Sequence, residues 1–370
     1  MAQVFIVDEQ TLSVHLKYMF AGTGAKDYSC EYLFKKNINV HPTVERLLTG
    51  MIADISRIKK EDKILFYLQQ TRNHEGMFFG SFKVEEEPFL CADEYLKSDL
   101  GKNLTFRVKI LPDEVYQKGI TEREALDSLK NIKHPSEMCW SLIYRKLKGN
   151  RGCTMITDYE YNSLMNKIRQ KNDNKKINYL NFDYDEKQNI IIESKENFEY
   201  KGNKNSLEIK DRLIYKREKG SAYESHLQAY ILQNIFDIPQ LRVSNSPITW
   251  IGNEVSCGVG MQSIDICFIQ ECKESVDIII CELKDEQPID YIQYQLKKYV
   301  DWIIDYLVPT YSKRVTIHPT IVAPKPNEHS KELLKSIKET TKFSSDKLEV
   351  REIRYVSFDF DNEQILFKEE

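Results

Sequence analysis

Two acidic residues and a lysine lie within apolar segments of the C-terminal half. The stretch 263–284, SIDICFIQECKESVDIIICELK, reads as two strands joined by a turn at 272–275. In that antiparallel register Asp265 lies opposite Glu282, and Lys284, two residues further on, points to the same face. A slip of one or two residues in the register would remove this facing.

Two like charges that face each other in apolar strands are unfavourable, and a divalent cation between them would remove the repulsion. Asp265, Glu282 and the backbone carbonyl of Leu283 are oxygen ligands of the kind that Mg²⁺ prefers. The alternative is an ordinary Asp–Lys or Glu–Lys pair at a strand end that reaches solvent. Taken alone, the D…ExK pattern does not decide between the two.

Three further features favour the site. Glu224 belongs to a predicted helix with Leu227, Gln228 and Ile231, which puts a carboxylate on or beside the buried stripe. Its alternative role is in a capping box with Ser221.

Gln295 and Tyr299 are four residues apart on one face of the next predicted helix, where they could instead be a polar edge of its apolar stripe. Lys216 and Arg217 precede Glu224 in a basic cluster that could meet phosphates, or could be plain solvated charge.

The order of these pieces resembles the PD-(D/E)XK nuclease superfamily, and within it the catalytic domain of NucS-type and RecB-like endonucleases. The matching pieces, ESHLQAYI, GVGMQSIDICF, IIICELK and QYQLKKY, lie between residues 221 and about 353. The spacing from Gly260 to Asp265 is longer than usual in the family, which leaves that loop in doubt.

The resemblance implies that Asp265, Glu282 and Leu283 hold Mg²⁺, with Mn²⁺ able to substitute. It implies that Lys284 orients a water or stabilises negative charge, and that Glu224 binds a metal-linked water or a second ion. Gln295 and Tyr299 would position phosphate or Lys284.

The N-terminal part resembles a different group, the PUA-like barrels that include EVE, ASCH and YTH domains. The resemblance rests on EDKILFYLQQ, GMFFGSFKVEEEPFL, FRVKILPDEVYQKGI and the late basic segment CWSLIYRKLKGNRGC. It implies a pocket for a flipped or modified base, formed by aromatic and polar side chains. The candidates are Trp140, Tyr144, Arg145 and Arg151, with Phe78 or Phe79; the alternative is that the aromatic rings are core residues.

The elements that must position these residues predict two domains, since 370 residues exceed one ordinary domain. We expect a PUA-like α+β barrel domain at 1–170, with strands near 63–70, 76–84 and 104–111. A linker is expected at 171–219, because 24 of the 54 residues in 166–219 are charged. A hairpin followed by β-α-β-α-β predicts a restriction-endonuclease-like α/β sheet domain at 220–370.

Composition narrows the function further. A net charge of −4 does not suggest a general nucleic-acid binder. No apolar run approaches the length of a membrane span, and the first residues show no signal pattern. We therefore expect a cytoplasmic protein. The eight cysteines contain no C-x-x-C pair and are expected to be reduced, buried thiols.

The predicted function is therefore a Mg²⁺-dependent DNA endonuclease in modification-dependent restriction. The alternatives are a mismatch- or structure-specific repair nuclease and a non-catalytic nucleic-acid-binding protein. DNA is the expected partner, a homodimer is possible, and no membrane is involved.

Overall fold

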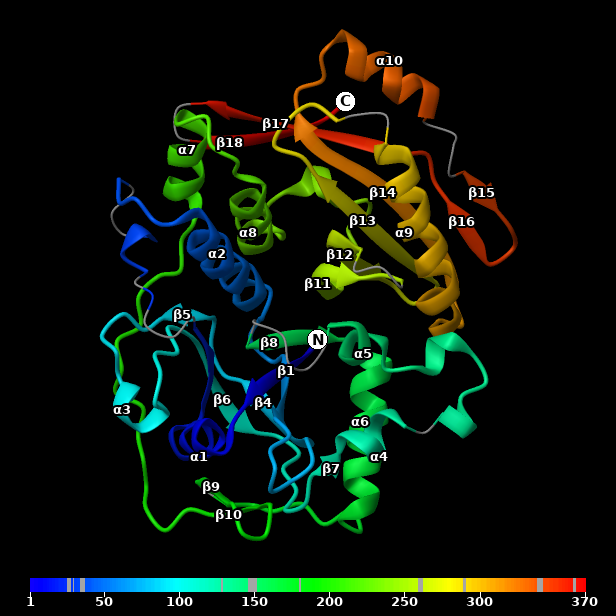
Figure 1. The fold of residues 1–370 in the computed structure, drawn as a ribbon. Helices are drawn as coiled ribbons and strands as arrows, with labels where there is room; N and C mark the ends of the chain where they lie inside the picture. The colour runs from blue at the N-terminus through cyan, green and yellow to red at the C-terminus, as the bar shows by residue number, and fades with distance from the viewer. Residues whose placement is uncertain are drawn as a thin grey trace. The chain divides into compact units, whose positions relative to one another are not determined.

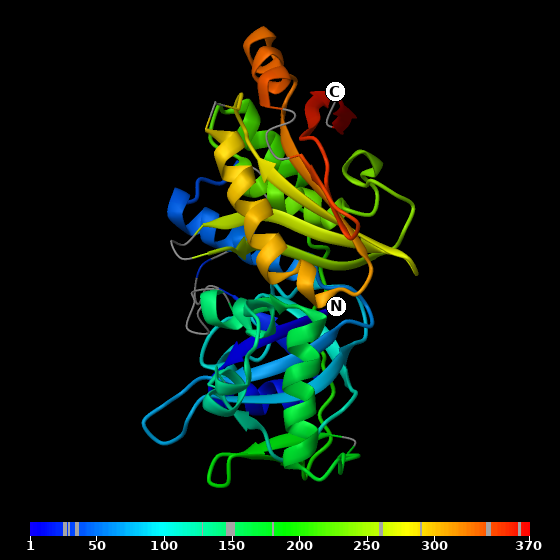
Figure 2. The same cartoon turned by 90° about the vertical axis from the view of Figure 1, so that its right-hand side faces the viewer.

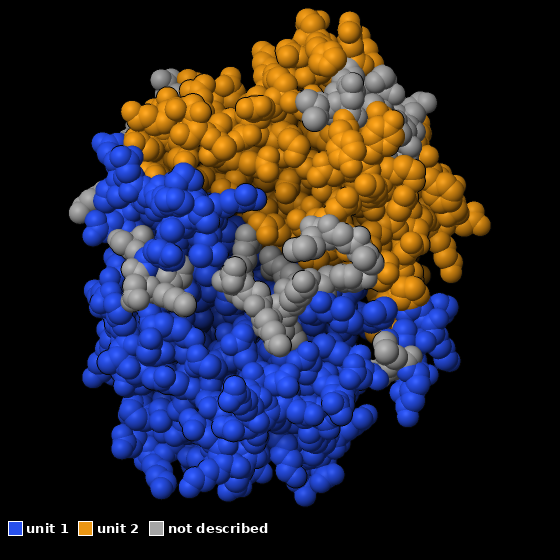
Figure 3. All heavy atoms as spheres, in the orientation of Figure 1, with its two compact units in different colours: residues 1–134, 138–207 blue, residues 135–137, 208–370 orange. Residues whose placement is uncertain are grey.

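The computed structural model describes residues 1–24, 28, 30–33, 37–127, 129–145, 152–179, 181–258, 262–288, 291–337, 342–361 and 364–370 (Figure 1). The chain divides into two compact units. Unit 1 comprises Met1–His134 and Met138–Leu207, and unit 2 comprises Pro135–Glu137 and Glu208–Glu370 (Figure 3). Within the described ranges, no helix is both long and apolar enough to span a bilayer.

Unit 1 is built on one curled, mostly antiparallel sheet. Its order is β2-β6-β4-β3-β1-β8, with β5 beside β6 and β7 beside β4, and only β1 and β3 of the described pairs run parallel. The two end strands approach each other, since the Gly152 N–H donates to Thr23 Oγ1 at 3.2 Å. The sheet is thus a partly closed barrel, in line with the barrel expected for this part of the chain. The strands are β1 (Ala2–Val7), β2 (Phe20–Thr23), β3 (Lys63–Leu68), β4 (Met77–Val84), β5 (Phe89–Leu90), β6 (Phe106–Pro112), β7 (Ile120–Thr121) and β8 (Cys153–Ile156).

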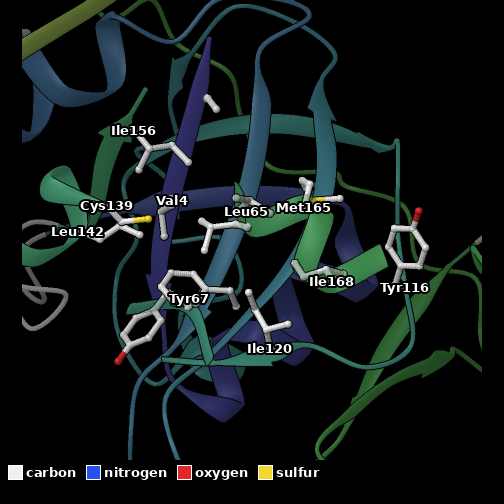
Figure 4. Packing of buried hydrophobic residues seen from close by; sticks show 14 residues of the cluster. Val4, Leu65, Tyr67, Tyr116, Ile120, Cys139, Leu142, Ile156, Met165 and Ile168 are labelled. Atoms are coloured by element: carbon white, nitrogen blue, oxygen red, sulfur yellow. The ribbon is translucent and has the colours of Figure 1, made fainter. Parts of the chain in front are cut away.

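Helices pack on this sheet, and α6 shares a buried hydrophobic cluster with its strands. Figure 4 shows Met165 and Ile168 of α6 beside Val4, Leu65 and Ile120, all of them in one buried cluster. Thr121 and Glu124 form a capping box at the start of α4, where each side chain accepts the other residue's backbone N–H. The helices of unit 1 are α1 (Glu9–Tyr18), α2 (Pro42–Ser56), α3 (Lys97–Leu100), α4 (Glu122–Leu126), α5 (Trp140–Arg145) and α6 (Asp158–Lys171), with 3₁₀ turns at Glu31–Leu33 and Leu129–Asn131.

The segment expected as a charged linker, 171–219, is structured and divided between the units. A hairpin of β9 (Phe182–Asp185) and β10 (Ile190–Glu193) buries Phe182 and Ile191, and Phe182 packs its ring at 5.9 Å from that of Phe82. The units meet in sequence at residue 207, and α7 (Lys210–Glu218) belongs to unit 2. Charged residues dominate the composition of this segment, and its few buried aromatic and aliphatic residues are spaced apart. Composition alone therefore suggests a solvated connector.

Unit 2 is built on a mixed sheet of order β11-β12-β13-β14-β16-β15, with β17 beside β14 and β18 beside β17. Strands β13, β14 and β17 run parallel, and β11, β12 and β13 run antiparallel, so the predicted hairpin and crossovers are present. The edge strands β11 and β18 were not expected. The strands are β11 (Ile248–Ser256), β12 (Ser263–Glu271), β13 (Ser275–Leu283), β14 (Arg314–Pro324), β15 (Phe343–Ser344), β16 (Leu348–Val350), β17 (Arg354–Asp361) and β18 (Gln364–Glu369).

Two helices of unit 2 matter for the site. Helix α8 (Glu224–Asn234) packs against β13, and α9 (Ile292–Tyr306) packs against β13 and β14, beside which it runs in Figures 1 and 2. Helix α10 (Glu328–Ile337) follows β14, and 3₁₀ turns occur at Pro135–Glu137, Pro239–Leu241 and Val308–Thr310. All eight cysteines are free and seven are buried, the exposed one being Cys272.

Candidate functional site

The β12–β13 hairpin brings the two predicted carboxylates together. Its register pairs Glu271 with Val276 and Ile266 with Cys281, as the sequence predicts, so the next facing positions are Asp265 and Glu282. Asp265 Oδ2 accepts the backbone N–H of Leu283 at 2.7 Å, which fixes its carboxylate beside β13. Gln228 of α8 donates to the Asp265 carbonyl at 2.9 Å and ties the helix to this strand.

Glu282 is almost fully buried, with 2% of its surface exposed. Its Oε1 accepts Lys284 Nζ at 2.5 Å, while its Oε2 is buried and has no hydrogen-bond partner among the described residues. Lys284 also donates to the Leu283 carbonyl at 2.9 Å. A buried carboxylate oxygen without a donor is costly, and it marks a place where a further group would be stabilised.

Glu224 is the first residue of α8, and its carboxylate faces Lys284, with 3.9 Å between Oε2 and Nζ. The helix has Tyr223 as its N-cap and no side-chain cap, so the alternative capping box with Ser221 is not formed. Tyr223 instead donates its backbone N–H to Asp285 Oδ2 at 2.8 Å, which fixes the helix start next to the end of β13. Glu224 is therefore part of the same charged cluster.

Gln295 and Tyr299 link α9 to the start of β12. Gln295 Nε2 donates to the Tyr299 hydroxyl at 2.7 Å, and that hydroxyl donates to the Ser263 carbonyl at 2.8 Å. Asp265 lies two residues after Ser263. The structure shows these two side chains holding the strand that carries Asp265, and it shows no hydrogen bond from either of them to Lys284.

Electrostatics distinguish the roles of the charged groups. Burial, and then the negative charges of Glu282 and Glu224, hold the pKa of Asp265 well above its usual range, although the Leu283 N–H opposes this. Burial alone would lower the pKa of Lys284, but the carboxylates around it outweigh burial and raise that pKa. Lys284 is thus a cation at neutral pH, suited to stabilise negative charge and unsuited to accept a proton.

A divalent cation fits this donor set. No three His, Cys, Asp or Glu side chains in the described part of the chain are close enough to hold a metal by themselves. Two facing carboxylates, one with an unpartnered oxygen, and the Leu283 carbonyl nevertheless match the preference of Mg²⁺, which keeps several waters and uses one or two carboxylates. Burial and the charge of Glu282 raise the pKa of Asp265, and such an ion would offset that charge.

Two exposed tyrosines at the start of α9 were missed by sequence reasoning. Tyr291 and Tyr294 are 55% and 57% exposed, their ring centroids are 6.2 Å apart, and Lys298 Nζ lies 5.9 Å from the Tyr291 ring. The Gln295 N–H donates to the Tyr291 carbonyl at 3.3 Å, so Tyr291 lies one helical turn before Gln295. The signal was present in the sequence, since both tyrosines fall outside the apolar stripe of α9.

Three of the candidates for a base pocket in unit 1 are core residues. Trp140, Phe78 and Phe79 are each 2% exposed or less, so their rings offer no face to a base and serve as core residues. The side chains of Tyr144 and Arg145, and all of Arg151, lie outside the described residues.

The basic pair Lys216 and Arg217 lies on α7 rather than in a linker. The Arg217 guanidinium lies 5.1 Å from the Phe360 ring centroid. The pair therefore belongs to unit 2, the unit that carries the carboxylates.

Comparison with known proteins finds no matching family model and no match among curated proteins. Several solved structures resemble part of the chain. The DUF55 domain of human thymocyte nuclear protein 1 is 11% identical, with a TM-score of 0.27, and the match covers 45% of this chain and 98% of that one.

Human THYN1 protein in complex with 5-methylcytosine-containing DNA is 10% identical, with a TM-score of 0.26, 45% of this chain covered and 96% of that one. A protein from Pseudomonas syringae is 12% identical, with a TM-score of 0.28, 45% of this chain covered and 99% of that one. These identities and TM-scores are too low to transfer a function.

Proposed function

We propose that unit 2 is a Mg²⁺-dependent endonuclease that hydrolyses phosphodiester bonds in DNA. The observation that carries the proposal is the buried Glu282 carboxylate, which has one unpartnered oxygen, faces Asp265 and is held by the charged Lys284. A site built from two carboxylates and a lysine suits hydrolysis of a phosphodiester, whose reacting group is anionic throughout. The exposed Tyr291 and Tyr294 and the cation Lys298 offer a surface for DNA next to it.

Asp265, Glu282 and the Leu283 carbonyl would hold the ion, which supplies an activated water and neutralises charge on the phosphate. Lys284 adds a fixed positive charge where negative charge develops on the phosphate oxygens. Glu224, 3.9 Å from Lys284, helps to keep that ammonium ionised. Gln295 and Tyr299 act as positioning residues, since they hold the start of β12 against α9.

Cleavage of plasmid DNA by the full chain tests this proposal. We expect cutting in Mg²⁺ or Mn²⁺, none in EDTA, and none for Glu282→Gln in either metal. Asp301→Asn is the matched control, because its carboxylate pairs with Lys297 on the exposed face of α9 and should not matter. Cutting by Glu282→Gln at the rate of the unchanged protein would refute the site.

Modification-dependent restriction, with unit 1 reading the base, is the finer form of the proposal. Its test is cleavage of matched duplexes with cytosine or 5-methylcytosine, together with duplexes that carry a mismatch. Cutting confined to the methylated duplex supports restriction, and cutting confined to the mismatch supports a repair nuclease. DNA binding without cutting in any metal would leave a non-catalytic nucleic-acid-binding protein.

A further inference from the structure

Unit 2 contains a cavity of about 570 Å³ on the sheet face opposite Glu282. In the β13–β14 register Glu282 pairs with Ile321 and Ile279 pairs with His318. Residues an odd number apart on a strand point to opposite faces, so His318, which lines the cavity, and Glu282 belong to different sites. The lysine and arginine side chains of the lining are Arg242, Lys342, Arg351 and Arg354.

The acidic side chains of the lining are already paired. Glu349 accepts from Arg314 and Arg351 at 2.9 Å each, and Glu352 accepts from Lys342 at 3.0 Å. Arg314, Lys342 and Arg351 are more than half exposed, and exposed pairs of this kind are weak, so an anion with several charges can compete for the cations.

Arg354 is different from these cations. Glu369 binds it at 2.8 and 3.1 Å, and the Gln240 carbonyl at 2.8 Å, so its role is structural. It contributes positive charge to the cavity wall without being free to move to a ligand.

Arg242 gives the cavity a positive charge with one unpaired donor, which an anion would complete. Its Nε is buried and has no hydrogen-bond partner among the described residues, and one Nη is 3.4 Å from the Ser246 carbonyl. A guanidinium has five donors in a fixed fork that matches a phosphate group, and a buried charged donor without an acceptor is costly. A phosphate in the cavity would supply the missing acceptor.

Phe343 adds an aromatic surface beside these cations. It lies on the short strand β15 of the β15–β16 hairpin, seen at the end of the sheet in Figure 1, and its side chain is 52% exposed. An aromatic ring beside cations is the combination that binds a base and its phosphate, and the volume falls within the range of small-ligand sites. We infer that this cavity is a second binding site of unit 2, for a nucleotide phosphate, from a free nucleotide or from the phosphorylated end of a strand.

Isothermal titration of the full chain in EDTA tests the inference, with ATP, adenosine, inorganic phosphate and a 5′-phosphorylated oligonucleotide as probes. We expect one saturable site for ATP or for the oligonucleotide, with adenosine and phosphate each at least about 10-fold weaker. Arg242→Gln should weaken the bound probe about 10-fold or more, since charge-assisted contacts to phosphate are the strong ones. Phe343→Ala should weaken it about 5-fold or more through lost stacking.

Arg351→Gln, at an exposed side chain, is a second variant that keeps the fold, and Arg72→Gln in unit 1 is the matched control. Saturation by ATP identifies a free-nucleotide site. Saturation by the oligonucleotide alone identifies a strand-end site when Arg242→Gln weakens it, since DNA bound at Tyr291 and Tyr294 would not respond to that variant. The inference is overturned if neither probe saturates, if phosphate binds as tightly as ATP, or if the folded Arg242 and Arg351 variants bind like the unchanged protein. Because Glu282 lies on the other sheet face, these outcomes do not depend on nuclease activity.

Discussion

Replacing Asp265 by Asn should stabilise the metal-free protein while removing its response to Mg²⁺. The Asn amide oxygen can accept the Leu283 N–H as Asp265 Oδ2 does at 2.7 Å, so the local geometry is kept. The substitution removes the negative charge that faces Glu282. Burial and the charge of Glu282 are what raise the pKa of Asp265. The variant thus separates the electrostatic cost of the carboxylate from its structural contact.

The size of the effect follows from the register. Directly opposed strand residues have Cβ atoms roughly 5 Å apart, and two unit charges at that distance repel by about 3 kcal/mol at an effective dielectric constant of about 20. Lys284, bound to Glu282 Oε1 at 2.5 Å, offsets part of this repulsion. We expect a net gain of about 1–2 kcal/mol, or about 2–8 °C in Tm for a unit of this size.

The gain should depend on pH with a definite sign. The folded-state pKa of Asp265 lies above its unfolded value, so the stability from holding this proton is full below the unfolded pKa. That stability is lost as pH rises through the folded-state pKa. The Asn variant should match the unchanged protein in acid and become increasingly more stable as pH rises.

Calorimetry of the full chain from about pH 4 to about pH 9, in EDTA and then in excess Mg²⁺, measures this. Mg²⁺ should raise the Tm of the unchanged protein and leave that of the variant in place, because a ligand stabilises only the state that binds it. Asp301→Asn on α9 is the control and should shift stability by less than about 0.5 kcal/mol at each pH. A variant less stable than the unchanged protein at high pH, or one equally stabilised by Mg²⁺, refutes the reasoning.

Three further predictions concern single side chains. Lys284→Ala should lower the single-turnover cleavage rate by at least about 10²-fold, while DNA affinity changes little. If cleavage and DNA affinity fell together, Lys284 would be a phosphate anchor instead. Tyr291→Ala and Tyr294→Ala should each weaken DNA binding, measured in Ca²⁺, about 5-fold or more. Neither variant should slow the cleavage of DNA that is already bound. An unchanged DNA affinity would exclude stacking on these rings.

Burial raises the pKa of Glu160 in α6 to about 7, against the hydrogen bonds of Thr157 and Ser141. The free energy of unfolding of unit 1 should therefore fall by about 3 kcal/mol between about pH 4.5 and about pH 7 in the unchanged protein. In Glu160→Gln it should stay level over the same range. Calorimetry measures this, and an equal fall in the variant and the unchanged protein would contradict the prediction.

The hairpin that carries Asp265 and Glu282 was predictable because its signals are local. β-branched runs on either side of a short turn define both strands, and the turn alone sets which residues face each other. The start of α8 was not predictable in the same way. Ser221 and Glu224 have capping-box spacing, but the helix begins at Glu224 because Tyr223 binds Asp285, a residue 62 positions away.

The structured segment 171–219 and the buried Trp140 have a common physical explanation. Sequence composition counts charges, but burial depends on which face of the folded chain a side chain occupies. Phe182 and Ile191 are buried although charged residues surround them, and Trp140 is buried although a basic run follows it. An aromatic residue near basic residues therefore predicts a binding surface only when its position also falls outside the apolar pattern, as Tyr291 and Tyr294 do.

The alternative to a metal site, an ordinary ion pair at the end of a strand, explains only half of the observed contacts. Lys284 bonds one oxygen of Glu282 and leaves the other buried without a donor. It also leaves Asp265 facing Glu282, and burial together with the charge of Glu282 keeps the pKa of Asp265 raised. A lone ion pair between Glu282 and Lys284 would be more stable with an apolar residue at position 265. A bound divalent cation would instead give Glu282 Oε2 a partner and make the carboxylate of Asp265 favourable. Both unexplained features therefore have one physical cause if the site binds a cation.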